Sequence, residues 1–259
     1  MLKNYIKIAF RNLSRRLGYT TINILGLAIG ISCCLLIGIY VIDELSYDKF
    51  HEEADNIYRV NVTYSMGGAS ESIYLTPTAL LPTMKREFND VVTGTRIFDV
   101  AMFSPQVVSI NDISFQEERF FYVDSTFFDV FSFELKQGVK NTSLVDPNSV
   151  ILTESMVRKY FGKNNALGEI IKVGQKEYKV TGVMKDVPDN SHLKFDFLAS
   201  FSSLNASKGE TWWSANYATY LLVNKNANLS LIEEGIEKVS REVLGKEVFQ
   251  NDDRIIFDL

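Results

Sequence analysis

Histidine and cysteine, which often carry out catalysis or bind metals, are few in this sequence. The two histidines, His51 and His192, lie far apart, and the two cysteines, Cys33 and Cys34, sit together inside an apolar run. A zinc site needs Cys and His ligands at short, regular spacings, and a catalytic triad needs a nucleophile placed against a base. Neither pattern is present. We therefore predict no catalytic residue, no metal site and no bound cofactor.

Nucleotide and nucleic-acid binding are also not indicated. Gly162-Lys163 lacks the upstream glycine and the following Ser or Thr of a phosphate-binding loop. The only cluster of basic residues lies at the N-terminus, and the rest of the chain is strongly acidic, which disfavours contact with phosphate backbones. We expect a protein that is not an enzyme and has no nucleic-acid partner.

The charges are divided unevenly along the chain. Residues 1–42 contain five basic residues and no Asp or Glu, whereas residues 43–259 contain 22 basic and 32 acidic residues, a net charge of −10. This asymmetry accompanies the 26 uncharged residues from Leu17 to Ile42. As a helix they would extend roughly 39 Å, longer than a hydrocarbon core of about 30 Å. The sequence predicts a transmembrane helix at 18–42.

A cleaved signal peptide is the main alternative for this segment. Its apolar region would be shorter and would end in small residues, but this run ends in Tyr40-Val41-Ile42-Asp43-Glu44. An uncleaved anchor is the better interpretation. The basic residues precede the span, so the N-terminus should be cytoplasmic and residues 43–259 periplasmic. Residues 1–17 alternate apolar and basic faces, which predicts an amphipathic elbow on the inner leaflet.

Small residues form a stripe along the predicted span. Gly26, Gly30, Cys34 and Gly38 are each four positions apart. Such a stripe lets another helix approach closely, and we predict it as a helix-packing face. Glycine is also common in membrane helices generally, so the stripe alone leaves both interpretations open.

The exported part shows two strand–helix–strand units at its ends. The first has strands at 57–64 and 94–100 with a helix capped by Thr76-Pro77 between them. The second has a strand at 217–223 and then a helix. We expect a capping box at Ser230 and Glu233 to start this helix and Gly245 to end it, ahead of an extended segment at 254–259. Either the two units are a repeat or the alternation is a coincidence of an α+β chain.

The middle region reads as short strands and turns. Thr153 caps a short helix that Gly162 ends. Outside this region, Gly67-Gly68 marks a loop in the first strand–helix–strand unit. The strands at 170–173 and 178–184 form a hairpin about Gly174-Gln175.

These motifs, taken together, resemble a known family of membrane proteins. The apolar span contains Asn23–Gly30 and is followed by Asp43–His51 and Ala54–Val60. The middle region adds the segments Ser149–Ser155, Tyr160–Gly162, Ala166–Ile170, Tyr178–Val183 and Asp186–His192. In this order they resemble the N-terminal part of an ABC transporter permease of the MacB/FtsX-like type found in Bacteroidetes. The resemblance covers nearly the whole chain.

The resemblance implies an α+β fold. One N-terminal transmembrane helix would be followed by a mixed α/β, porter-like periplasmic core domain with an inserted, mostly β subdomain. The porter-like part would comprise 43–145 and 205–259, and the insertion 146–204. It also implies a non-catalytic permease subunit of the cell inner membrane that couples cytoplasmic ATP hydrolysis to movement of the periplasmic domain for export or efflux.

The partners implied are a cytoplasmic ABC ATPase, a second permease copy, and a periplasmic adaptor with an outer-membrane channel. We predict a rigid joint between membrane and domain, made by Asp43, Glu44, Tyr47, Asp48, Phe50 and His51. The resemblance implies three later spans, but no further apolar run of that length follows Ile42, so we expect a truncated permease. The alternative is a single-pass, membrane-anchored binding or sensor protein, for which the short segment before the span offers no signalling domain.

Overall fold

The computed structural model describes residues 2–66, 69–248 and 254–259. The predicted loop Gly67-Gly68 lies outside these residues. The chain divides into two compact units, Met1–Tyr47 and Asp48–Leu259.

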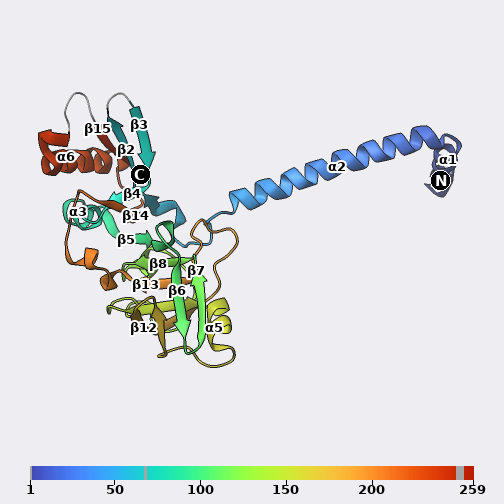
Figure 1. Cartoon of the computed structure of the whole chain (residues 1–259). Helices are drawn as coiled ribbons and strands as arrows, with labels where there is room; N and C mark the ends of the chain where they lie inside the picture. Colours follow the sequence, from blue (N-terminus) through green and yellow to red (C-terminus); the bar gives the residue numbers. More distant parts are fainter. Residues whose placement is uncertain (1, 67–68, 249–253) are drawn as a thin grey trace. The chain divides into compact units, whose positions relative to one another are not determined.

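The first unit consists of two helices, α1 (Leu2–Arg15) and α2 (Leu17–Leu45) (Figure 1). Arg16 between them has a non-helical backbone (φ −125°, ψ 57°). Among the described residues α2 is the single helix that is long and apolar enough to cross a membrane. It begins one residue before the predicted span and ends three residues after it. Its side chains are almost all exposed in this unit, as lipid-facing side chains would be.

In the second compact unit, Asp48–Leu259, the elements of the two predicted strand–helix–strand units interleave in space. The elements are β1 (Ile57–Arg59), β2 (Asn61–Met66), β3 (Ala69–Ile73), β4 (Leu75–Pro77), α3 (Leu80–Glu87), β5 (Val91–Asp99), β14 (Ala215–Val223), α6 (Leu229–Val248) and β15 (Arg254–Asp258). Val60 interrupts the predicted strand 57–64, although its N–H still donates to the Thr219 carbonyl at 2.9 Å.

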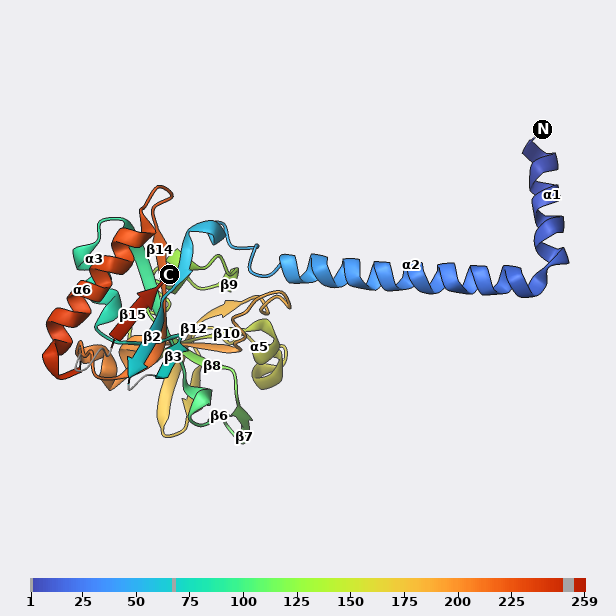
Figure 2. The same ribbon diagram turned by 90° about the horizontal axis from the view of Figure 1, so that it is seen from above.

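Strand β14 lies between β1 and β5 in the large sheet and is antiparallel to both, whereas β15, β2 and β3 form a separate three-stranded antiparallel sheet in that order. This is the arrangement of a split β-α-β fold, because β14, which belongs to the second predicted strand–helix–strand unit, lies between β1 and β5 of the first one. Helices α3 and α6 lie on the same side of the strands (Figure 1, Figure 2). Their apolar side chains, including Leu80, Met84 and Ile236, share one core with Leu221. We call this part the split half.

The sheet continues beyond β5 into a second half, in the order β5–β8–β13–β10–β12–β11–β6–β7. The elements are β6 (Gln106–Ile110), β7 (Ile113–Glu117), β8 (Phe120–Val123), α4 (Phe127–Val130), β9 (Leu135–Gln137), β10 (Ser149–Thr153), α5 (Glu154–Phe161), β11 (Ile170–Val173), β12 (Lys176–Met184) and β13 (Phe197–Ser200). Four short 3-10 helices complete the described elements, at Ala54–Asn56, Val100–Met102, Phe201–Ser203 and Asn205–Lys208.

Local signals predicted helix α5 and the hairpin of β11 and β12 in this second half, whereas no element was predicted for the segment that forms β6, β7, β8, α4 and β9. Thr153 Oγ1 accepts a hydrogen bond from the Met156 N–H at 3.4 Å and so caps α5. Gly162 ends α5 with φ 64°, and Gly174 has φ 58° between β11 and β12, a conformation that favours glycine. Strands β6, β8 and β9 pair with β11, β13 and β12 of the predicted insertion. The boundaries at 146 and 204 stay a prediction.

Three predicted helix ends were wrong. Thr76-Pro77 lies in β4 instead of capping a helix, because the Thr76 hydroxyl donates to the Tyr217 carbonyl at 2.8 Å and the segment pairs with β14. Helix α6 begins at Leu229, so Ser230 lies inside its first turn. Gly245 does not end α6, which continues to Val248. A glycine inside a helix costs only about 1 kcal/mol, which the packing of the preceding Leu244 in the core offsets.

Candidate functional site

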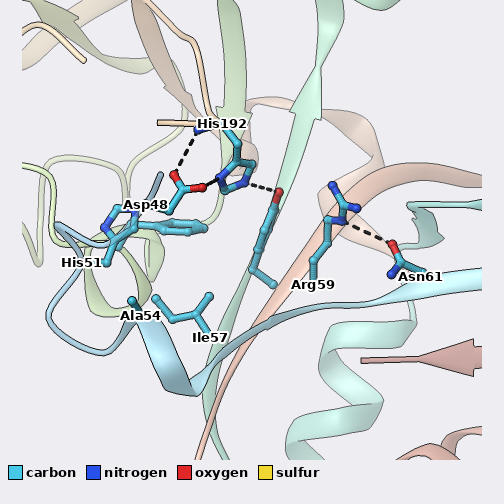
Figure 3. A pocket seen from close by; sticks show the side chains of 9 residues that line it. Asp48, His51, Ala54, Ile57, Arg59, Asn61 and His192 are labelled. Atoms are coloured by element: carbon cyan, nitrogen blue, oxygen red, sulfur yellow. Dashed lines mark hydrogen bonds and ion pairs between the residues drawn. The ribbon is translucent and has the colours of Figure 1, made fainter. Parts of the chain in front are cut away.

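A cavity of about 320 Å³ lies where the second unit begins (Figure 3). Segments far apart in the sequence meet there. It is lined by Asp48, His51, Ala54, Ile57, Arg59, Asn61, Phe131, His192 and Tyr220. Two of the predicted joint residues, Asp48 and His51, therefore come together with the second histidine and with a tyrosine of β14.

Asp48, the first residue of this unit, is held by three hydrogen bonds to one turn. Its N–H donates to the Asn190 carbonyl at 2.8 Å. Its carboxylate accepts from the His192 N–H at 3.0 Å and from His192 Nδ1 at 2.7 Å. Asp48 also has a positive φ of 56°, which is uncommon outside glycine, although Asp adopts it more readily than most residues. The three bonds stabilise this conformation at a fixed place in the domain.

The ring of His192 continues this contact to β14. Its Nε2 lies 2.7 Å from the Tyr220 hydroxyl. A carboxylate only accepts hydrogen bonds, so His192 Nδ1 carries the proton that faces Asp48, and Nε2 shares a second hydrogen bond with the Tyr220 hydroxyl. Burial raises the pKa of Tyr220 to about 12, so its phenol stays protonated and is a poor nucleophile. The three side chains together connect Asp48 to β14. We call Asp48, His192 and Tyr220 the clasp.

His51 anchors the same segment a second time. It is only 5% exposed, and its Nδ1 accepts a hydrogen bond from the Ser132 N–H at 3.1 Å. Its ring lies 5.1 Å from those of both Phe131 and Phe133, and Phe50 lies 5.5 Å from Phe133. Phe50 and His51 thus pack into the aromatic core of the domain.

Burial of His51 has a consequence for stability against pH. Burial lowers the pKa of His51 to about 4, with nearby His192 acting in the same direction and Asp48 opposing. The unfolded chain binds a proton near pH 6.5 and the folded one near pH 4. His51 should therefore favour unfolding increasingly as the pH falls from about 6.5 to 4, by up to about 3 kcal/mol.

Thermal unfolding of the whole chain in lipid nanodiscs at pH 7.5 and pH 4.5 measures this effect. We expect His51→Gln to be less stable than wild type at pH 7.5 but to lose less stability on acidification. An equal loss in both proteins would show that His51 is not the group responsible.

The remaining predicted site residues lie in the first unit. Asp43 and Glu44 are in the last turn of α2, and Tyr47 is in the turn that follows, its N–H donating to the Glu44 carbonyl at 3.4 Å. At Gly26, Gly30 and Gly38 an added Cβ would meet nothing within 4 Å, and Cys34 is exposed. The joint role of Asp43, Glu44 and Tyr47 and the helix-packing role of the small-residue stripe stay predictions. Among the described residues there is no group of three or more His, Cys, Asp or Glu that could hold a metal ion.

Sequence reasoning missed Tyr220 and gave His192 no role beyond a loop position. Tyr220 carries no local signal, because it reads only as one of several aromatic residues of a buried strand. The signal for His192 was weak but present: Pro188–Ser191 predicts a turn, and a histidine immediately after a turn can reach a neighbouring segment.

The fold and this anchored segment define a mixed α/β domain that follows an apolar helix. A family model for the MacB-like periplasmic core domain matches residues 20–239, so the chain belongs to this family. Members of this family are components of ABC transporter permeases, and membership implies association with an ATPase. The predicted resemblance and fold class are confirmed, and the protein is membrane-anchored with an extracytoplasmic domain.

Solved structures agree on the fold. A domain of a Porphyromonas gingivalis protein described as a permease is 18% identical with a TM-score of 0.67, and the match covers 80% of this chain and 90% of that one. The periplasmic region of MacB from Actinobacillus actinomycetemcomitans is also 18% identical, with a TM-score of 0.54 and coverage of 78% and 88%.

The extracellular domain of the ABC-type transporter YknZ from Gram-positive bacteria is 14% identical, with a TM-score of 0.54 and coverage of 78% and 100%. No curated protein matches the chain. At these identities the structures establish a shared fold, and the Porphyromonas protein agrees with the predicted Bacteroidetes type.

Proposed function

We propose that this chain is a non-catalytic permease subunit of an ABC transporter of the inner membrane. It couples ATP hydrolysis in the cytoplasm to movement of the periplasmic domain, for export or efflux. The observation that carries the proposal is the match of the MacB-like periplasmic core domain to residues 20–239, which include most of the apolar helix α2. The basic residues before α2 support a cytoplasmic N-terminus.

The joint between the units supports coupling. Helix α2 ends at Leu45, and only Ser46 and Tyr47 separate it from Asp48. Asp48, Phe50 and His51 are then fixed by hydrogen bonds and ring packing. A displacement of α2 would enter the domain through a short segment with several firm attachments, instead of being absorbed by a long flexible linker.

The proposed partners follow the same scheme. A cytoplasmic ABC ATPase drives the movement, a second permease copy completes the membrane part, and a periplasmic adaptor with an outer-membrane channel extends the path. Helix α1, with its basic residues, lies on the inner leaflet.

Crosslinking and affinity purification of the chain from native membranes test this proposal. We expect recovery of a subunit with a phosphate-binding loop whose ATP hydrolysis rate changes when the chain is present. Recovery of intact, folded chain without any ABC ATPase would contradict the proposal and favour a single-pass, anchored binding or sensor protein.

The small-residue stripe predicts where a partner span packs. Gly30→Leu should weaken association of the chain with a second permease copy by about tenfold or more, since a bulky side chain on the stripe prevents close approach of two helices. The periplasmic domain should stay folded. Association is measured by energy transfer between labelled copies in lipid vesicles.

Ala28→Leu is the matched control, because it places the same leucine side chain on another face of α2. If Gly30→Leu and Ala28→Leu associate equally well, the stripe is not a packing face.

A further inference from the structure

His192 is the point at which three parts of the second unit meet. Its backbone N–H and Nδ1 bind Asp48, and its Nε2 binds Tyr220. It ends the turn 188–192, in which the Ser191 N–H donates to the Pro188 carbonyl at 3.2 Å. The Lys194 ammonium braces the same turn by donating to the Pro188 and Asp189 carbonyls at 2.9 and 2.7 Å.

One connection from His192 reaches the split half. Tyr220 lies in β14, which pairs with β5 along one edge and with β1 and β4 along the other. A pull on the Tyr220 hydroxyl therefore acts on the strand that holds the split half together.

The other connection reaches the second half through the chain itself. Leu193 and Phe195, directly after His192, are buried in the aromatic core. The chain then enters β13, which pairs with β8 and β10. The turn that holds Asp48 is thus continuous with the centre of the second half.

There is space beside the clasp for movement. His192 and Tyr220 line both the cavity of about 320 Å³ and another of about 350 Å³, whose walls include Tyr74, Met102 and Phe121. Side chains that border a cavity can change position without the repacking that a filled core would require.

We propose that His192 and Tyr220 are positioning residues that divide a movement entering at Asp48 between the two halves of the domain. The Tyr220 hydroxyl passes it to the split half, and the turn 188–192 passes it to the second half. This inference rests on the proposed function, since it assumes that α2 moves when ATP is bound.

The test uses the complete transporter complex in nanodiscs, with Cys33 and Cys34 replaced by alanine. Spin labels are placed at Ile42→Cys, near the end of α2, and at either Lys238→Cys on α6 or Lys176→Cys on β12, both of which are exposed. The two distances are measured by pulsed electron paramagnetic resonance without nucleotide and with a non-hydrolysable ATP analogue.

In otherwise wild-type protein we expect both distances to change with the analogue. Tyr220→Phe removes one hydroxyl and keeps the ring contact with Phe131. It should abolish the change at Lys238→Cys and leave the change at Lys176→Cys. Asp48→Ala should reduce both changes, because it removes the carboxylate contacts with His192 and leaves the anchors at Phe50 and His51 in place. Asp48→Asn should retain both, because Asn tolerates the positive φ and keeps a polar partner for His192.

The inference is overturned if Tyr220→Phe changes neither response or abolishes both. If the otherwise wild-type protein shows no response to the analogue, the proposed function fails and this inference fails with it. Circular dichroism reports whether each variant is folded. Should Tyr220→Phe not fold, the Asp48→Ala and Asp48→Asn pair decides, and equal responses in these two would contradict the role of the clasp.

Discussion

Replacement of Phe131 by alanine is expected to lower the free energy of unfolding of the periplasmic domain by about 3–5 kcal/mol. Phe131 is 1% exposed, and its ring lies 5.1 Å from each of the rings of His51, Phe127 and Tyr220. Alanine would leave a cavity next to His51 and Tyr220, which both hold the segment that follows α2. Denaturant unfolding of the whole chain in nanodiscs measures the loss.

Phe131→Leu is the control for this prediction. It keeps most of the apolar volume and should cost clearly less than the alanine variant, about 1 kcal/mol. A loss below about 1 kcal/mol for Phe131→Ala would mean that the aromatic core does not support the joint as described.

Asp124→Ala is expected to destabilise the domain by about 3–5 kcal/mol, because it leaves a largely buried arginine without its partner. The Asp124 carboxylate accepts from Arg96 Nη2 at 2.7 Å and from Arg96 Nε at 2.9 Å. The two side chains are only 15% and 12% exposed. Arg96 belongs to β5 and Asp124 follows β8, so the pair bridges the border between the two halves. The free energy of unfolding in denaturant measures this loss.

The exposed pair Arg86–Glu210 provides the comparison. It is also joined by two hydrogen bonds, at 2.9 and 3.0 Å, but its side chains are 55% and 45% exposed. Solvent screens such a pair, so Glu210→Ala should cost less than about 1 kcal/mol. Equal losses in Asp124→Ala and Glu210→Ala would contradict a special role for the border pair.

Much of the fold could be predicted because its signals are local. The apolar run that forms α2, the cap at Thr153 and the turn at Gly174 are each read from a few neighbouring residues. The wrong helix ends came from contacts that are not local. Thr76 has the sequence of a helix cap, but pairing with β14, more than a hundred residues later, places it in a strand. Interleaving of the two strand–helix–strand units has the same cause.

The candidate site was predictable only in part for a similar reason. Asp48, Phe50 and His51 stood out because they follow the span and carry the family resemblance. The residues that receive them come from the turn before β13 and from β14. Neither the pairing of Asp48 with His192 nor the position of Tyr220 leaves a trace in local spacing, since the fold alone brings these segments together.

We propose that α2 moves the periplasmic domain through a rigid joint. The most direct test of this movement measures the Ile42–Lys238 distance with and without an ATP analogue. It compares the protein with its native joint and a variant in which a segment of four Gly and Ser residues is inserted after Ser46. We predict a nucleotide-dependent change in the native joint and its loss in the insertion variant, while ATP hydrolysis by the complex continues. The same change in both proteins would contradict the claim.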